Sequence, residues 1–366
     1  MPKLGEIIKA IEEFAPLQYQ ESYDNSGLLL GDREQEISQA LIALDCTEAV
    51  IDDAIQKNCQ LVIAHHPILF SGIKSITGKN YVERVMLKAI RNHIAIYAAH
   101  TNLDNVYGGV NHKIAEKLQL VDCTILAPKT KALKQMYVYV PSDCADTVRE
   151  ALFLSGAGSI GEYSQCSYNI EGIGTYLPSN QANPYIGKRN TYQEEKEIKI
   201  EVIYPFEKES HILQALQKSH PYEEIAYGII PLDNATAYLG SGMMGTLHEE
   251  LSETAFLAYL KRILNTQSIR HTAFLNKTIR TVAICGGSGS FLLSKAIKAG
   301  ADAFVSADFK YHQFFDADGQ ILIADVGHFE SEQFTSEIFY EVLSKIFPNF
   351  ALHLTSVNTN PINYFN

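Results

Sequence analysis

The 366-residue sequence lacks several features that would point to common classes of protein. Its six cysteines are scattered and form no C-x-x-C pair, which argues against a disulfide framework and a thiolate zinc site. No apolar run approaches the roughly 20 residues that a membrane helix needs. The N-terminus has an amphipathic pattern with acidic residues in place of a signal peptide. We therefore expect a cytoplasmic protein with no membrane partner.

Clustered positive charge is also scarce. The formal net charge is −12, and the densest basic stretch is the short segment 129–134. Such a chain repels polyanions at long range, so nucleic acid is not an expected partner. The sequence also has no G-x-S-x-G elbow, which argues against an enzyme with a serine nucleophile of that class.

Strand and helix patterns alternate over residues 39–121 and again over residues 280–356. Short apolar runs between helical periods are typical of buried parallel strands in βαβ units. The stretches 39–66 and 280–308 have almost the same element order and length. We therefore predict an α/β fold in which two similar halves form one discontinuous core domain, residues 1–127 and 236–366, with the metal site described below.

The pattern changes between these halves. Residues 128–235 read as strand, helix, two strands, helix and strand, with a loop rich in Asn, Gly and Pro between the second and third strands. That order is the βαββαβ plan of ferredoxin-like α+β domains. We predict an inserted domain here, since a domain whose termini lie close together is tolerated as an insertion.

Two adjacent histidines stand at the end of one predicted buried strand. Side chains alternate faces within a regular strand, so His65 and His66 can serve one site only where the strand ends. Pro67 restricts His66 to extended geometry. Both rings can then reach the crevice beyond the strand ends, where open α/β sheets bind ligands. Histidine is the commonest metal ligand, so the pair indicates a metal site.

Two other predicted strands end in further donors. The segment "AAHTNLDN" places Asp104 at the same edge, and "GHFESE" places His328 and Glu332 four residues apart on one helix face. With His65 and His66 these are five nitrogen or oxygen donors, more than one catalytic ion usually takes. We predict two divalent transition-metal ions, and the donor set suits Zn, Fe, Mn, Co or Ni.

Several polar residues near these strand ends are candidates for other roles. His100, Asp308 and His312 are candidate catalytic residues, as a proton shuttle, as groups that orient a ligand or as substrate contacts. Their alternative roles are capping and surface hydrogen bonding. We expect His100 to orient a ligand or contact substrate instead of binding metal.

A glycine-rich loop supplies the candidate substrate site. The segment "CGGSGS" follows a strand and opens a helix, so the backbone N–H groups of Gly286, Gly287 and Gly289 could hold an anion. The alternative is a tight structural turn, since the loop lacks the dinucleotide fingerprint and the P-loop lysine. Asn25, with Asp24, either caps a turn or faces the site.

The motifs "YDNSGLLLG", "AHHP", "HTNLDN" and "GHFESE" together resemble the family of GTP cyclohydrolase 1 type 2 homologues, the Nif-three-like proteins. The resemblance covers the whole chain and includes an insert similar to the PII and CutA folds. It implies a dinuclear metal site at His65, His66, Asp104, His328 and Glu332. It also implies a homo-oligomer, a hexameric toroid with the metal sites facing an internal cavity that takes a small molecule.

Two functions are compatible with these features. Two ions can lower the pKa of a bound water and clamp a phosphoryl or carbonyl oxygen, which favours a metal-dependent hydrolase acting on a small phosphorylated or nucleotide-like metabolite. The alternative is a non-enzymatic metal-dependent sensor of small molecules, or a metal-handling protein, with the insert as its regulatory part. GTP cyclohydrolase activity itself is not expected. The authentic type I enzyme is described by a zinc site with cysteine ligands, and this sequence offers no such site.

Overall fold

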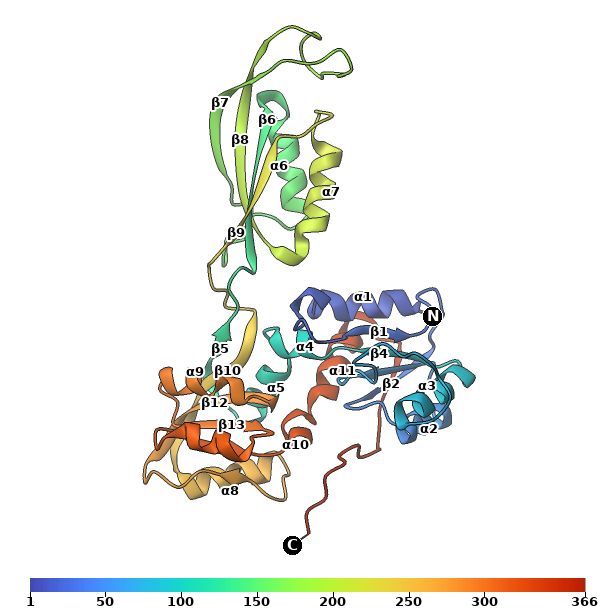
Figure 1. Ribbon diagram of the computed structural model, residues 1–366, viewed down its shortest axis with the longest axis vertical. Coiled ribbons are helices and arrows are strands. Elements are labelled where there is room, and N and C mark those ends of the chain that lie inside the picture. The colour runs from blue at the N-terminus through green and yellow to red at the C-terminus, as the bar shows by residue number, and fades with distance from the viewer. Residues whose placement is uncertain (366) are drawn as a thin grey trace. The chain divides into compact units, whose positions relative to one another are not determined.

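The computed structural model describes residues 1–365, which separate into two compact units (Figure 1). The core unit comprises Met1–Pro128 and the chain from Ala237 onward, and the insert comprises Lys129–Thr236. These limits lie one residue beyond the boundaries that the sequence pattern suggests. The chain is a mixed α/β protein with three sheets, two in the core unit and one in the insert.

The first sheet of the core unit has the order β1-β4-β3-β2-β15. Its four strands β15, β2, β3 and β4 are parallel, and β1 is an antiparallel edge strand. Every residue of β3 and β4 is buried, as expected of parallel strands with helices on both faces. The strands are β1 (Gly27–Leu30), β2 (Gln39–Ala43), β3 (Leu61–Ala64), β4 (Ala95–Ala98) and β15 (Ala351–Leu354).

Helices connect and cover this sheet. The connecting helices α2 and α3 begin at side-chain caps, since Thr47 accepts from the backbone of Val50 and Asn80 accepts from the backbone of Glu83. The helices are α1 (Leu4–Phe14), α2 (Glu48–Gln56), α3 (Tyr81–Arg91), α4 (Thr101–Asn105), α5 (Val110–Lys117) and α11 (Thr335–Ile346).

The second sheet has the order β11-β14-β13-β12-β10-β5. Strands β12, β13 and β14 are parallel, and the other three pair antiparallel. The strands are β5 (Val121–Pro128), β10 (Gly240–Ser252), β11 (Arg270–His271), β12 (Thr278–Ser288), β13 (Ala303–Ala307) and β14 (Leu322–Asp325), and the helices are α8 (Glu253–Ile263), α9 (Leu293–Lys298) and α10 (His328–Glu332). Both sheets therefore contain three consecutive strands of the chain in parallel.

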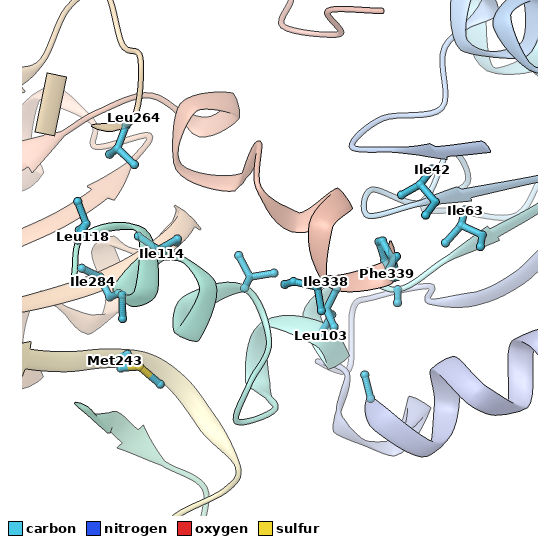
Figure 2. Packing of buried hydrophobic residues seen from close by; sticks show 14 of the residues in the cluster. Ile42, Ile63, Leu103, Ile114, Leu118, Met243, Leu264, Ile284, Ile338 and Phe339 are labelled. Atoms are coloured by element: carbon cyan, nitrogen blue, oxygen red, sulfur yellow. The ribbon is translucent and has the colours of Figure 1, made fainter. Parts of the chain in front are cut away.

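One hydrophobic cluster joins the two sheets of the core unit (Figure 2). It contains Ile42 and Ile63 from the first sheet, Ile284 from the second, and Phe339 of α11. All four side chains are almost fully buried. Since the sheets share this core, the carboxyl ends of their strands are held in a fixed arrangement.

The insert has its own sheet and its own core. Its elements are β6 (Leu133–Pro141), α6 (Ala145–Leu154), β7 (Tyr168–Tyr176), β8 (Gln193–Pro205), α7 (Glu209–Ser219) and β9 (Tyr227–Leu232). The sheet is antiparallel with the order β7-β8-β6-β9. Val138 and Ile200 of the sheet pack with Leu152 of α6 and Leu216 of α7.

Several elements differ from the sequence-based expectation. Strands β1, β5 and β10 and helix α8 are absent from the predicted pattern. The expected last helix is divided, because α10 ends at Glu332 and α11 begins at Thr335. None of the helices within residues 1–365 has the length and apolar content required to cross a lipid bilayer.

Candidate metal centre

The five predicted donors come together in the core unit. His65 and His66 follow β3, Asp104 lies on the short helix α4 after β4, and His328 and Glu332 begin and end α10 after β14. Parallel strands bring their carboxyl ends to the same edge of a sheet, and the shared core brings the two edges together. Helix α10 places His328 and Glu332 one turn apart on one face.

The donor atoms form two groups that share one carboxylate. His65, Asp104 and Glu332 form one group, and His66, His328 and Glu332 form the other. Within each group the donor atoms all lie within 4.8 Å of one another. Glu332 is buried and belongs to both groups, so its carboxylate could contribute to an ion held by either group.

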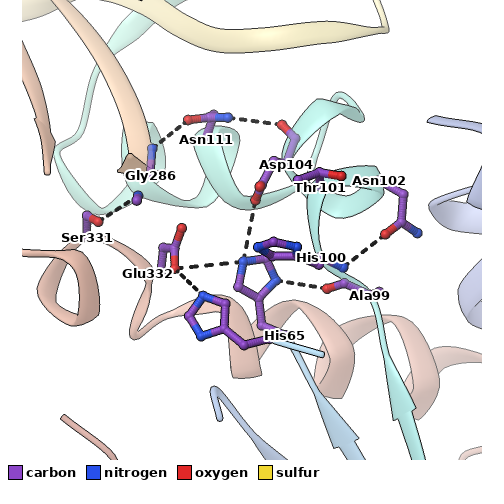
Figure 3. A network of polar contacts seen from close by, with 12 residues as sticks. His65, Ala99, His100, Thr101, Asn102, Asp104, Asn111, Gly286, Ser331 and Glu332 are labelled. Carbon is purple, nitrogen blue, oxygen red and sulfur yellow. Dashed lines mark hydrogen bonds and ion pairs between the residues drawn. The ribbon is translucent and has the colours of Figure 1, made fainter. Parts of the chain in front are cut away.

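The distances around Glu332 describe this arrangement. Its Oε2 lies 2.9 Å from His66 Nε2, 3.1 Å from His328 Nε2 and 3.8 Å from His65 Nε2. His65 Nε2 lies 3.5 Å from Asp104 Oδ1. Figure 3 shows Glu332 and Asp104 both directed toward the ring of His65.

Two buried atoms of the cluster have no hydrogen-bond partner within the described chain, residues 1–365. They are His65 Nε2 and Asp104 Oδ1. A buried polar atom without a partner costs roughly 1–3 kcal/mol. A cation bound by both atoms would satisfy them, and nitrogen and carboxylate donors suit a divalent transition metal. The residues present therefore fit a metal centre.

The ring orientation of the paired histidines is set by hydrogen bonds at Nδ1. His65 Nδ1 lies 2.8 Å from the backbone oxygen of Ala99, and His66 Nδ1 lies 2.7 Å from Asp45 Oδ1. When Nδ1 donates to such an acceptor, Nε2 is left free to bind a metal. Asp45 is not among the residues expected from sequence, although it follows β2 as the histidines follow β3.

The other two histidines near the cluster are oriented in the same way. Asp308 Oδ2 lies 2.7 Å from His328 Nδ1, and Asp24 Oδ1 lies 2.8 Å from His100 Nδ1. Asp308 and Asp24 therefore orient these imidazoles, which is one of the roles expected of Asp308 from the sequence. The donor atoms of His100 also group with those of His65 and His66, so His100 borders the centre directly.

The electrostatics of the cluster show a strong demand for positive charge. Burial lowers the pKa of His66, but hydrogen bonds to Asp45 and Glu332 outweigh it and raise the pKa to about 9. For His328, burial is outweighed mainly by the charge of Glu332, and the pKa rises to about 11. Without another cation, both imidazoles hold protons at neutral pH to balance the carboxylates.

The two carboxyl groups respond to burial in opposite directions. Burial raises the pKa of Asp104 to about 7, with a further contribution from the charge of Glu332. Burial acts the same way on Glu332, but the charge of His328 and hydrogen bonds from the imidazoles hold the pKa of Glu332 well below its usual range. Near neutral pH Glu332 is thus ionised, whereas Asp104 is divided between its protonated and its ionised form.

The glycine loop packs closely against Glu332 and Ser306. The N–H of Gly286 donates to Asn111 Oδ1, and the N–H of Gly287 donates to the hydroxyl of Ser331. A Cβ on Gly287, which has a φ of +59°, would lie 2.4 Å from Glu332 Oε1. A Cβ on Gly289 would meet the side chain of Ser306 at 2.3 Å. The N–H groups of Gly286 and Gly287 are thus already paired within the fold, and the substrate contacts expected of this loop stay a prediction.

Two further predicted residues lie away from the centre. His312 is exposed and contacts the rings of Tyr311 and Phe315, outside both the donor groups and the cavity. The side-chain amide of Asn25 donates to the backbone oxygen of Leu69. A proton shuttle at His312 and a substrate contact at Asn25 thus have no support in the geometry.

The donor groups border a cavity of about 670 Å³. Its walls include aromatic and apolar side chains such as Phe70, Tyr81, Phe291 and Phe329. This volume lies in the usual range for sites that take small molecules. No lysine or arginine is among the lining residues, all of which belong to the described part of the core unit.

The C-terminal segment also lines this cavity. The Thr359 hydroxyl donates to Asp45 Oδ2, 2.5 Å away, and the Asn360 amide donates to Glu330 Oε1, 3.0 Å away. Asp45 orients His66, and Glu330 lies on α10 between His328 and Glu332. The segment therefore contacts supports of the centre from both sheets, a connection that sequence patterns did not indicate.

Comparisons with known proteins identify the family of this chain. The family described as Duf34/NIF3 (NGG1p interacting factor 3) matches residues 2–361. Relatives named GTP cyclohydrolase 1 type 2 homolog are 39% identical over 365 residues in Halalkalibacterium halodurans, covering 98% of each chain, and 39% identical over 326 residues in Bacillus subtilis, covering 88% of this chain and 87% of that one.

A solved structure is also similar over the full length. The crystal structure of a Bacillus cereus protein related to NIF3 aligns with 100% of this chain and 99% of its own, with a TM-score of 0.85 and 36% identity. The expected family is therefore confirmed, and the chain belongs to the Duf34/NIF3 family of GTP cyclohydrolase 1 type 2 homologues.

Proposed function

We propose that the core unit binds two divalent transition-metal ions and hydrolyses a small phosphorylated or nucleotide-like metabolite. The observation that carries this proposal is the presence of Glu332 in both donor groups. His65, Asp104 and Glu332 would hold one ion, and His66, His328 and Glu332 the other. When bound, such ions supply Lewis acidity toward a phosphoryl or carbonyl oxygen and lower the pKa of water.

The cavity limits the class of substrate. With aromatic walls and carboxylates but no lysine or arginine, this chain's own lining offers little to a highly charged anion. A nucleoside triphosphate would have only the two proposed ions, and no side-chain cation, to balance its charge. The lining instead favours a flat, apolar or heteroaromatic body that carries at most one phosphate, with its polar group at the metal centre.

His100 is the residue of this chain best placed to move a proton. Its Nδ1 is held by Asp24, which leaves Nε2 free at the edge of the donor cluster. An imidazole in this position can accept a proton from, or give one to, a group at the centre. His100 would therefore be the catalytic base or acid, and Asp24 would position it.

A metabolite-extract screen with metal-loaded protein tests this function. Turnover should require metal and should disappear in Asp104→Asn. His100→Gln should retain its metal and lose most of its rate, whereas Glu249→Gln, at an exposed position of β10, should behave as wild type. Saturable binding without consumption of any compound, under every metal loading, would overturn the hydrolase.

The same screen distinguishes the second candidate, a metal-dependent sensor with a regulatory insert. The observation that favours it is a separate cavity within the insert.

We also propose that the chain forms a homo-oligomer, a hexameric toroid by resemblance to its family. Light scattering after gel filtration would give the mass of a hexamer if this is correct and that of a monomer if it is wrong.

A further inference from the structure

The insert contains a cavity of about 760 Å³ that the metal centre does not use. It lies among β6, β7 and β8, the connection over residues 177–192 and the segment after α7. Two hydrogen bonds fix that connection. The Tyr176 hydroxyl donates to the backbone oxygen of Ile186, and the backbone N–H of Asn183 donates to Glu223. The cavity is therefore a built feature of the insert.

Tyrosine rings form much of its wall. Tyr139, Tyr176, Tyr185 and Tyr222 line the cavity. The ring of Tyr222 lies 6.3 Å from those of Tyr176 and Tyr185 and is tilted against both, by 59° and 53°. The faces of such rings carry negative charge density, which attracts cations.

A neutral histidine holds part of this wall in place. His220 Nδ1 accepts from the backbone N–H of Tyr222, and His220 Nε2 donates to the backbone oxygen of Tyr139. Burial lowers the pKa of His220, so the ring stays neutral at physiological pH. The positions of Tyr222 and Tyr139 are therefore coupled through a group that adds no positive charge.

Carboxylates supply the charge of the cavity. Glu171, Glu197, Glu223 and Glu224 are among the lining residues, against one cation, Lys199. The ammonium group of Lys199 is already paired with Glu201 and lies 5.0 Å from the ring centre of Tyr137, and neither of these residues lines the cavity. The lining thus has a strong excess of negative charge.

Glu197 is the carboxylate most closely built into the wall. Its Oε1 accepts from the hydroxyl of Tyr222 at 2.9 Å. Its Oε2 lies against Gly174, where an added Cβ would approach to 2.1 Å. Gly172, directly opposite Glu197 in the sheet register, has no atom within 4 Å of its Cβ position. Glycines within a strand weaken it and often mark the close approach of a ligand.

We propose that this cavity binds an organic ammonium ion. Tyrosine faces combined with carboxylates recognise alkylated ammonium groups, and the volume lies in the range of small-molecule sites. An anionic ligand is disfavoured by the charge of the lining. A bare metal ion is disfavoured because, within residues 1–365, no cluster of metal-binding side chains falls in the insert.

Titration calorimetry of the full-length protein with choline and with spermidine tests the proposal. At least one should bind saturably, and Glu197→Gln should weaken that binding by about tenfold. Tyr176→Leu should weaken it similarly. Glu150→Gln is the matched control, since it removes the same charge from an exposed position of α6 outside the cavity.

Three results would overturn the proposal. The first is no saturable binding of either compound. The second is equal loss of affinity in Glu197→Gln and Glu150→Gln, which would indicate general charge attraction. The third is competition by Mg²⁺ at equal concentration, which would indicate an inorganic cation site. Circular dichroism of each variant separates loss of a ligand from loss of the fold.

Discussion

The two cavities of this chain share an acidic character but differ in the atoms that carry it. The core cavity presents imidazole nitrogens together with deeply buried carboxylates such as Glu332. The insert cavity presents tyrosine rings and more exposed glutamates. Nitrogen and carboxylate donors within 4.8 Å suit a small metal ion, whereas several tyrosine rings around one cavity suit a larger organic ion. Similar charge thus indicates different ligands when the donor geometry differs.

Among the variants of the core cavity, Glu332→Gln should cause the largest loss of bound metal. The amide keeps the size of the side chain but removes the charge that both donor groups share. We expect elemental analysis to show a fall from two ions per chain to well below one, while choline binding by the insert is unchanged. Two ions retained in Glu332→Gln would show that this carboxylate does not bridge them.

Removal of the groups that orient His66 should have a smaller effect on metal affinity. Asp45→Asn weakens the acceptor for His66 Nδ1 and should reduce metal affinity by about 10- to 100-fold. Thr359→Val removes only the hydroxyl that holds Asp45 and should cost less than Asp45→Asn. Competition with a chromogenic chelator measures both.

One outcome would contradict the role proposed for the C-terminal segment. If Thr359→Val binds metal as wild type while Asp45→Asn is weakened, the C-terminal segment has no positioning role. Asn363→Ala serves as a control in the same segment, because Asn363 is exposed and does not line the cavity. Equal metal affinity in all three variants and wild type would show that Asp45 does not orient His66 for metal binding.

The two cavities should differ in the number of protons released when a ligand binds. In the metal-free protein the pKa values of His66 and His328, about 9 and about 11, lie above neutral pH. Each imidazole must lose a proton before Nε2 can bind an ion, so metal affinity should rise with pH between 6 and 8. Calorimetry in two buffers of different ionisation enthalpy should show between two and three protons released per chain at pH 7, because Asp104, with a pKa of about 7, adds a fraction of a proton to those of the two imidazoles.

The insert provides the internal control for that measurement. Choline binding involves no ligand that must lose a proton, so its affinity should change little over the same pH range. Metal binding with no dependence on buffer identity would contradict the charge states assigned to His66 and His328.

The smallest effect on the metal centre is expected from excision of the insert. The five donors all belong to the core unit, and the insert has a separate hydrophobic core. A chain in which a Gly/Ser linker joins Pro128 to Ala237 should keep its metal content and lose choline binding. An unfolded product by circular dichroism, even with added metal, would show that the core unit depends on the insert.

Much of the metal centre could be predicted because its donors follow buried strands. His65 comes directly after β3, while His328 and Asp104 lie on the short helices that follow β14 and β4. Parallel strands bring such positions to one edge. The same rule applies to Asp45, which follows β2, but a single aspartate after a strand is too common to stand out. Its importance appears only when the distance to His66 is known.

The remaining features depended on long-range packing. The Gly286–Gly289 loop has the composition of an anion-binding loop, yet its glycines make room for Glu332 and Ser306. Strand β10 contains three glycines and pairs antiparallel with β5 and β12, so it lacks the apolar run of a parallel strand. A local sequence pattern predicts neither which distant segments pack closely together nor which strand pairs with β10.

Anomalous diffraction from crystals of the metal-loaded protein tests the central claim most directly. We predict two anomalous peaks per chain in the core cavity, with one carboxylate, that of Glu332, in contact with both. Peaks at a single position, or two ions that share no contact with Glu332, would contradict the dinuclear centre proposed for this chain.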